Sequence, residues 1–293
     1  MRSFAQAPLA TSADQQSDSG AEAPAPPRPR IRLWLVCHRA QAIELVLGLF
    51  SIACCVAIWQ LLTSNGVNLY IRFENIPTPA AVVQSARHVL GSAEFGDHVV
   101  ASCRRIALGF VIAALVAVPL ALLMGRFSVV RALTFPVAEI IRPIPAIAWV
   151  PLAIMLWPTN EESIVFITFI GAFFPVLVNT LHGVNSVDPV LVRAARCLGA
   201  KELAVFREVY LPGALPHIFT GLTVGMGVAW VSLIAAEMIS GQYGIGYFTW
   251  QAYALVDYPG IVFGMITIGL LGLGAGWTIR LVGRFIMPWG YER

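Results

Sequence analysis

The chain has 293 residues, of which 58% are hydrophobic and only 12% are charged, with a formal net charge of +3. Soluble domains carry a charge on roughly a quarter of their residues, so this composition excludes an ordinary soluble domain and indicates that lipid surrounds most of the chain. The five cysteines form no CxxC pair and the five histidines have no metal-ligand spacing, so neither a disulfide framework nor a metal site is expected.

Residues 1–40 are predicted to form a disordered tail, because their first part is rich in Ala, Pro, Ser and Gln and contains no apolar core of the length of a secretory signal. Residues 41–293 are predicted to form one transmembrane domain. Six windows approach the ~20 apolar residues that cross a bilayer, at 43–63, 99–124, 133–157, 163–181, 215–239 and 259–281. We therefore expect an all-α, polytopic membrane protein with six transmembrane helices.

A short helix is predicted between the first two windows. It opens at Thr78-Pro79 and ends at Gly91, and its apolar residues are Val82, Val83, Ala86, Val89 and Leu90. This amphipathic pattern is typical of a helix that lies on the membrane surface.

The third window contains three prolines, Pro143, Pro145 and Pro151. Each removes a backbone donor and disturbs the helix, which is tolerated in lipid where neighbouring groups or water satisfy the freed carbonyls. The window is therefore a candidate for a pathway through the membrane, and a purely structural kink is the alternative. Glu139 and Arg142 are three residues apart, so they can pair on one helical face and lower the cost of both charges.

A charged segment, residues 182–214, separates the fourth and fifth windows. Asp188 is a good N-cap, Pro189 suits the first helical position, and Gly199 can end the helix in a left-handed conformation. A second short helix is predicted from about residue 200 to 209, with Pro212 closing it. The two helices would form a compact unit hinged at the glycine, and a solvated loop is the alternative.

The end of the fifth window carries Glu237, for which we expect a role in a gate or in a structural hydrogen bond. Gly241, Gly244 and Gly246 follow, in a stretch that is dense in aromatic residues. The glycines would allow a re-entrant bend over the pathway, whereas an aromatic belt at the membrane interface is the default interpretation.

The basic residues predict the orientation in the membrane, because Lys and Arg near membrane segments favour the cytoplasmic side. If the N-terminus is inside and all six windows span, most of the 19 basic residues lie inside, and only Arg72 and Arg87 lie clearly outside. We therefore predict that both termini and the segment 182–214 are cytoplasmic.

The same segment resembles the cytoplasmic EAA loop of ABC importer permeases, whose pattern is E-A-A-x-x-x-G, nine residues, then I-x-L-P. The matching positions here are Arg193, Ala194, Ala195, Gly199, Val209, Leu211 and Pro212. Arg193 stands in place of the family's Glu and reverses its charge, so a salt bridge from that Glu does not carry over. Val209 in place of Ile is conservative.

The resemblance extends over about residues 75–285 and is to permeases of the nitrate, sulfonate and taurine type. It rests also on the segments 142–152, 171–175 and 235–238. It implies a permease homodimer in the bacterial inner membrane, which docks two cytoplasmic ATPase subunits through the EAA loop and receives a small anion from an extracytoplasmic binding protein. The expected pathway or gate residues are Glu139, Arg142, Pro143, Pro145 and Glu237.

The sequence supports this division of labour, because a phosphate-binding P-loop needs a G-K-[ST] element and the sole lysine, Lys201, lies between Ala200 and Glu202. We therefore expect a transport subunit that is not an enzyme and holds no cofactor, with ATP and Mg²⁺ bound by the partner ATPase. Lipid is a further expected partner and nucleic acid is not. The alternative function is an ion-coupled secondary transporter that works without an ATPase.

Overall fold

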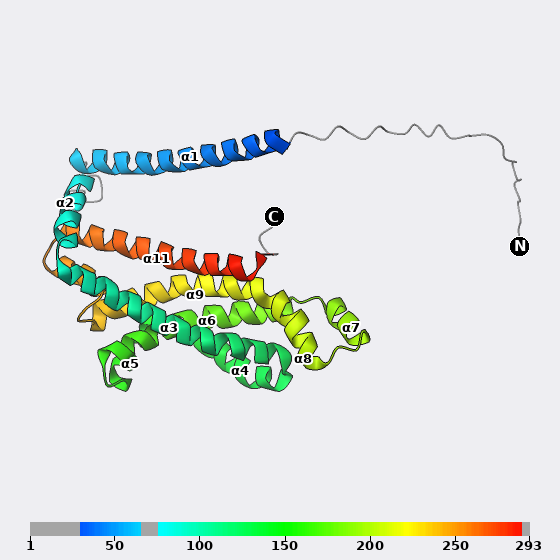
Figure 1. Cartoon of the computed structure of the whole chain (residues 1–293). Coiled ribbons are helices and arrows are strands. Elements are labelled where there is room, and N and C mark those ends of the chain that lie inside the picture. The colour runs from blue at the N-terminus through cyan, green and yellow to red at the C-terminus, as the bar shows by residue number, and fades with distance from the viewer. Residues whose placement is uncertain (1–29, 66–75, 289–293) are drawn as a thin grey trace, which may run out of the picture. The chain divides into compact units, whose positions relative to one another are not determined.

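The computed structural model describes residues 30–65 and 76–288, with side chains from residue 43 onward. The described residues contain helices and turns and no strand, which confirms the all-α prediction (Figure 1). The predicted tail, residues 1–40, lies outside the described residues up to residue 29, and the first helix, α1 (Arg30–Ser64), covers the remainder. The chain divides into two compact units, Met1–Val56 and Ala57–Arg293, and every element discussed below except α1 lies in the second.

Five helical stretches are long and apolar enough to cross a membrane, and they correspond to five of the six predicted windows. They are Ile43–Ser64 of α1, α3 (Ala93–Arg126), α6 (Asn160–Asn185), Glu202–Ser240, which ends with α9 (Leu211–Ser240), and α11 (Tyr258–Ile286). The remaining window, the third, is not a straight span. It is divided into α4 (Ser128–Ile141) and the helical stretch Ala146–Leu156, which meet at 89°.

The prolines of the third window explain this break. Arg142 ends α4, and Pro145 adopts an extended backbone before the short 3₁₀ turn η2 (Ala146–Trp149). Pro151 does not break the chain again, because it lies in the first turn of α5 (Val150–Leu156), where a missing backbone N–H costs no hydrogen bond. The stretch Ala146–Leu156 is too short to span alone, so the third window is a broken span or a re-entrant segment.

The core of the second unit lies where α6 packs against α3 and α9 (Figure 1). Small residues let these helices approach closely. On α3, Ala113, Ala117 and Ala121 recur every four residues and are fully buried. A side chain at Gly171 of α6 or at Gly225 of α9 would collide with the neighbouring helix. These close contacts make α3, α6 and α9 a rigid frame for the broken span.

The predicted short helix is present as α2 (Pro79–Leu90), capped by the Thr78 side chain. Its buried residue, Val82, packs with Phe95 of α3 and Phe263 of α11. One face of α2 is therefore used in packing, and its place at a membrane surface stays a prediction.

In segment 182–214, the first predicted helix is present with its predicted ends, whereas the predicted end of the second helix is wrong. Asp188 caps α7 (Pro189–Cys197), and Gly199 has a φ of +84°, as expected for a left-handed helix end. The prediction that Pro212 closes the second helix is wrong. Helical backbone runs from α8 (Glu202–Val205) through a π-turn, η3 (Phe206–Tyr210), directly into α9, and Pro212 lies in the first turn of α9.

Candidate translocation and coupling sites

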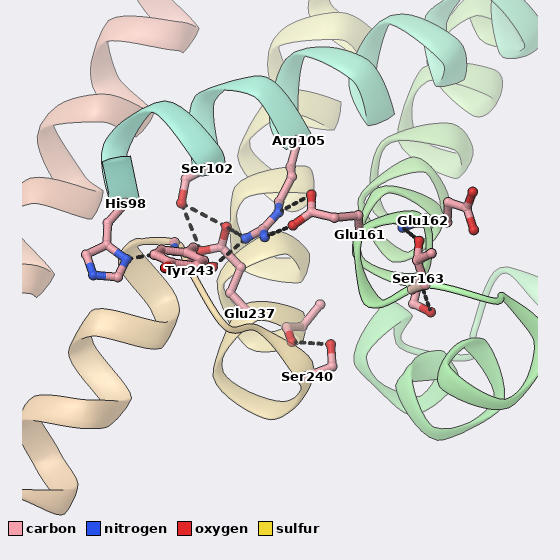
Figure 2. Close-up of polar contacts among 12 residues, drawn as sticks. His98, Ser102, Arg105, Glu161, Glu162, Ser163, Glu237, Ser240 and Tyr243 are labelled. Carbon is pink, nitrogen blue, oxygen red and sulfur yellow. Dashed lines mark hydrogen bonds and ion pairs between the residues drawn. The ribbon is translucent and has the colours of Figure 1, made fainter. Parts of the chain in front are cut away.

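A charge cluster joins Arg105 of α3, Glu161 at the start of α6 and Glu237 near the end of α9 (Figure 2). Arg105 of α3 donates from Nη1 to Glu237 Oε1 of α9 at 2.9 Å and from Nε to Glu161 Oε2 of α6 at 2.9 Å. A second bond joins Arg105 Nη2 to Glu161 Oε1, so the guanidinium is held bidentately by that carboxylate. Arg105 is 2% exposed and Glu237 is fully buried.

The cluster also fixes the turn that follows α9. Glu237 Oε2 accepts the backbone N–H of Gly246 at 3.0 Å, and Arg105 Nη1 donates to the Tyr243 carbonyl at 2.5 Å. Ser102 donates to both oxygens of Glu237 and accepts the N–H of Ile245 at 2.9 Å. The turn leads into α10 (Ile245–Ala254), so buried charges, rather than a local sequence signal, position the start of α10.

Gly244 is required in this turn for two reasons. Its φ of +121° lies in a region that side chains rarely adopt, and a Cβ there would collide with the carboxylate of Glu237. Its N–H is accepted by His98 Nδ1 of α3 at 3.0 Å. The glycines predicted to permit an irregular bend do so here at Gly244, although the gate role remains a prediction.

A structural hydrogen bond was one of the two roles expected for Glu237, and its contacts in this cluster fit that role. Glu237 does not line either of the hollows described below. Arg105 is the residue that sequence reasoning missed as its partner. The sequence did contain a signal for this pairing, namely an arginine inside the apolar window 99–124. A charge at mid-membrane costs roughly 2.5–3.5 kcal/mol on insertion scales, so such an arginine is expected to be paired.

The break in the third window opens onto a hollow of about 400 Å³. Its wall comprises the break itself and the facing sides of α6 and α9. The lining residues are Arg142, Ile144, Pro145, Ala146, Ile170, Gly171, Phe174, Pro175, Val178, Asn179, Val224 and Val228. Arg142 is the one charged residue among them, and its Nη1 lies 3.3 Å from Glu139 Oε1 of α4.

Of the sequence-predicted pathway residues, the structure therefore brings Arg142 and Pro145 to the hollow. Glu139 takes part through its ion pair with Arg142, which the spacing predicted. Pro143 belongs to the break but does not line the hollow, and Glu237 lies in the separate charge cluster.

The predicted coupling loop, residues 182–214 and called the coupling loop below, presents an apolar surface to its surroundings. Leu191 of α7 and Leu198, which directly follows α7, are exposed, Leu198 by 88%, and Leu203 of α8 is 77% exposed. Val192 is the buried residue that anchors α7. Leucines this exposed mark an interaction surface more often than a solvated loop.

The residues that match the EAA pattern are divided between this surface and the loop's base. Arg193 and Ala194 are exposed and Ala195 is half-buried, whereas Val209, Leu211 and Pro212 are half-buried where η3 enters α9. Within the described part of the chain, Arg193 makes no ion pair, so the charge that departs from the pattern is not neutralised by this protein's own helices.

Two ion pairs that the sequence did not predict meet at Glu202, one to α3 and one within the coupling loop. Glu202 Oε2 of α8 lies 2.7 Å from Arg126 Nη2 at the end of α3, and Glu202 Oε1 lies 2.9 Å from Arg196 Nε of α7. One carboxylate therefore links α3, α7 and α8.

Comparison with known families gives one family match. The model of the family described as "Binding-protein-dependent transport system inner membrane component" matches residues 110–288. This range contains the broken span, the coupling loop and Glu237.

Curated relatives match over most of their length. A putative ABC transporter permease protein of Methanocaldococcus jannaschii is 42% identical over 251 residues, which cover 84% of this chain and 92% of the relative. A taurine transport system permease protein of Escherichia coli is 34% identical, with 74% and 81% covered. A nitrate import permease protein of Synechocystis is 32% identical, with 81% and 88% covered.

A solved structure described as an amino acid ABC transporter with histidines has a TM-score of 0.56 to this chain at 18% identity. The match covers 70% of this chain and 97% of the other. At this identity the likeness concerns the fold alone.

Proposed function

Because the chain belongs to the binding-protein-dependent transport system inner membrane components and is the permease subunit of an ABC importer, we propose that it imports a small anionic solute. The proposed class is aliphatic sulfonates, taurine or nitrate-like oxyanions. The subunit is not an enzyme in this family, and the alternative of a secondary transporter that works without an ATPase is not supported by the family match.

The observation that carries the choice of substrate class is the hollow at the broken span. Its one charged lining residue is a cation, Arg142, and a guanidinium can bind the oxygens of a sulfonate or nitrate through two parallel N–H donors. The Arg142 side chain is half-exposed and its pair with Glu139 is long, at 3.3 Å, so an anion can compete for it. The taurine and nitrate permeases among the relatives support the same class.

We propose that the coupling loop receives the ATPase. Its exposed leucines and the rigid connection from α8 into α9 fit a surface that is covered by a partner and transmits the partner's movement. The proposed assembly contains two permease copies, two ATPase subunits, which hold ATP and Mg²⁺, and an extracytoplasmic binding protein.

The proposed orientation places both termini and the coupling loop in the cytoplasm of a bacterial inner membrane. The support is the excess of basic residues in the segments that this orientation puts inside. The coupling loop can then meet a cytoplasmic ATPase.

The test is uptake by the complete importer in proteoliposomes, with labelled taurine, an alkane sulfonate and nitrate offered separately. Arg142→Gln should reduce uptake of the transported anion by at least about tenfold, the loss expected when one charged hydrogen-bonding partner is removed. Arg131→Gln, on the same helix α4 but outside the hollow, is the matched control and should transport normally. Unchanged uptake by Arg142→Gln with intact assembly would remove Arg142 from the pathway.

A further inference from the structure

A second hollow, of about 420 Å³, lies along α3 and α6 away from the broken-span pathway. Most of its wall is apolar, with Leu108 and Ile112 from α3 and Val165, Phe166 and Phe169 from α6. The aromatic rings follow one another, since Trp157 and Phe166 have ring centroids 5.7 Å apart and Phe166 and Phe169 are stacked at 6.4 Å. We call this hollow the α3–α6 groove.

The groove has a charged end and an apolar end. Helices α3 and α6 run in the same direction, because Arg105 pairs with Glu161 and, farther along both helices, Gly109 lies against Thr168. Arg104 and Glu162 therefore lie at one end of the groove, and the apolar side chains follow toward the middle of the two membrane-spanning helices. A phospholipid has the same polarity, with a charged head at the membrane edge and a tail in the hydrocarbon.

Two basic and two acidic residues line that end of the groove, and not all of them form ion pairs. Arg105 is paired with both Glu161 and Glu237, and the Glu161 side chain is 54% exposed. Glu162 is turned away from that pair (Figure 2). Among the described residues, the Arg104 guanidinium and the Glu162 carboxylate make no ion pair, although Arg104 lies within electrostatic reach of Glu161, and both residues are exposed. The groove thus offers a cation and an anion that are exposed and make no ion pair, beside an apolar wall.

We propose that the α3–α6 groove binds a phospholipid with an ethanolamine headgroup. Arg104 takes the phosphate, Glu162 takes the ammonium, and one acyl chain lies along Leu108, Ile112, Phe166 and Phe169. This inference rests on the membrane location of the chain and not on its proposed substrate.

The charge pattern distinguishes ethanolamine from other headgroups. A choline headgroup is zwitterionic too, but its quaternary nitrogen has no N–H to donate to Glu162. A glycerol headgroup has a net negative charge and lacks the cation that Glu162 would bind, so it gains only from Arg104. Trp157, 39% exposed at the charged end, is typical of the membrane interface, where a headgroup would lie.

The test uses the complete importer, equilibrated with equal amounts of palmitoyl-oleoyl phosphatidylethanolamine, phosphatidylcholine and phosphatidylglycerol and examined by native mass spectrometry. The wild type should retain phosphatidylethanolamine in preference to the other two, at one tightly held molecule per permease chain. Arg104→Gln/Glu162→Gln should lower the retained phosphatidylethanolamine roughly fivefold or more, since two exposed ion pairs are lost. Arg87→Gln/Glu94→Gln removes one cation and one anion outside the groove and should retain it like the wild type.

Leu108→Trp tests the apolar wall without changing charge, and it should also release the lipid. Assembly with the ATPase confirms that each variant is folded. Equal retention of the three lipids by the wild type, or undiminished phosphatidylethanolamine in the double variant, would overturn the proposal. Displacement of the lipid by millimolar taurine would also overturn it, because the groove would then belong to a small zwitterionic solute.

Discussion

The Nη1 atom of Arg105 lies 2.9 Å from Oε1 of Glu237, although 132 residues separate the two in the chain. Both side chains are almost completely buried. Charges in this position are costly unless each is paired and its remaining donors and acceptors are satisfied. Here Glu161, Ser102, the Tyr243 carbonyl and the Gly246 N–H complete the cluster.

Removing one member of this pair should destabilise the permease strongly. Arg105→Met leaves Glu237 buried without its counter-charge, and breaking a buried pair in this way typically costs about 3–5 kcal/mol. We expect a large drop in the thermal unfolding midpoint of the purified complex. Arg131→Met, an exposed arginine on α4, is the matched control and should shift the midpoint little.

The double variant Arg105→Met/Glu237→Met separates pairing from packing. Because it removes both buried charges together, it should recover part of the stability that Arg105→Met loses. If the two single losses simply add in the double variant, the contact between Arg105 and Glu237 contributes nothing, contrary to this interpretation.

Gly244 should not tolerate even a methyl group. Its backbone region costs other residues on the order of 1–3 kcal/mol, and the added Cβ would meet the Glu237 carboxylate. We expect Gly244→Ala to lower the unfolding midpoint and to increase proteolysis at the turn before α10. Gly274→Ala on α11, where a Cβ meets open space, should be neutral or slightly stabilising. Equal midpoints for the two variants would contradict the assigned backbone strain.

Substitutions of Gly199 should be harmful according to how poorly the new residue adopts the left-handed backbone conformation, and not according to the size of its side chain. A Cβ at Gly199 has no neighbour within 4 Å, but the φ is +84°. A left-handed residue with a Cβ costs on the order of 1–2 kcal/mol, and more for a β-branched side chain. Gly199→Val should therefore reduce transport-coupled ATPase activity, whereas Gly199→Asn should largely retain it, because Asn visits this region readily. Normal coupling in Gly199→Val would count against the coupling role of the loop.

Cys197, exposed at the end of α7, provides a test of orientation and docking. In a variant in which the other four cysteines are replaced by serine, a membrane-impermeant maleimide should label Cys197 from the cytoplasmic side only. Assembly with the ATPase should slow this labelling, because the partner covers α7. Labelling of intact cells from outside would reverse the proposed topology.

Local signals in the sequence predicted the elements whose ends are set by their own residues. Thr78-Pro79 marks the start of α2, and Asp188-Pro189 and Gly199 mark the two ends of α7, because a cap depends on neighbouring backbone groups. The break of the third window could be expected from Pro143 and Pro145, but its angle could not, since α4 packs against α3 and the second half packs against α6 and α9.

Contacts between distant segments could not be predicted in this way. Nothing near Arg105 indicates that Glu161 and Glu237 will surround it, because the packing of three helices brings them together. Pro212 misled the prediction for a related reason. The π-turn before it shifts the hydrogen bonding so that the Leu211 N–H reaches the Phe206 carbonyl, five residues back, and helical backbone can continue into α9 past the proline.

The uninterrupted backbone from the coupling loop into α9 makes that helix a lever. At 1.5 Å per residue, the 30 residues of α9 measure about 45 Å. Glu237, clamped to α3 by Arg105, lies three residues from one end and serves as the fulcrum, and the coupling loop lies at the far end of the long arm. Leu211 lies about 39 Å from Glu237 along the helix, so a tilt of about 5° around Glu237 displaces Leu211 by ~3 Å. A small displacement of the coupling loop can therefore change the orientation of the α9 residues that line the broken-span hollow without unfolding any turn of helix.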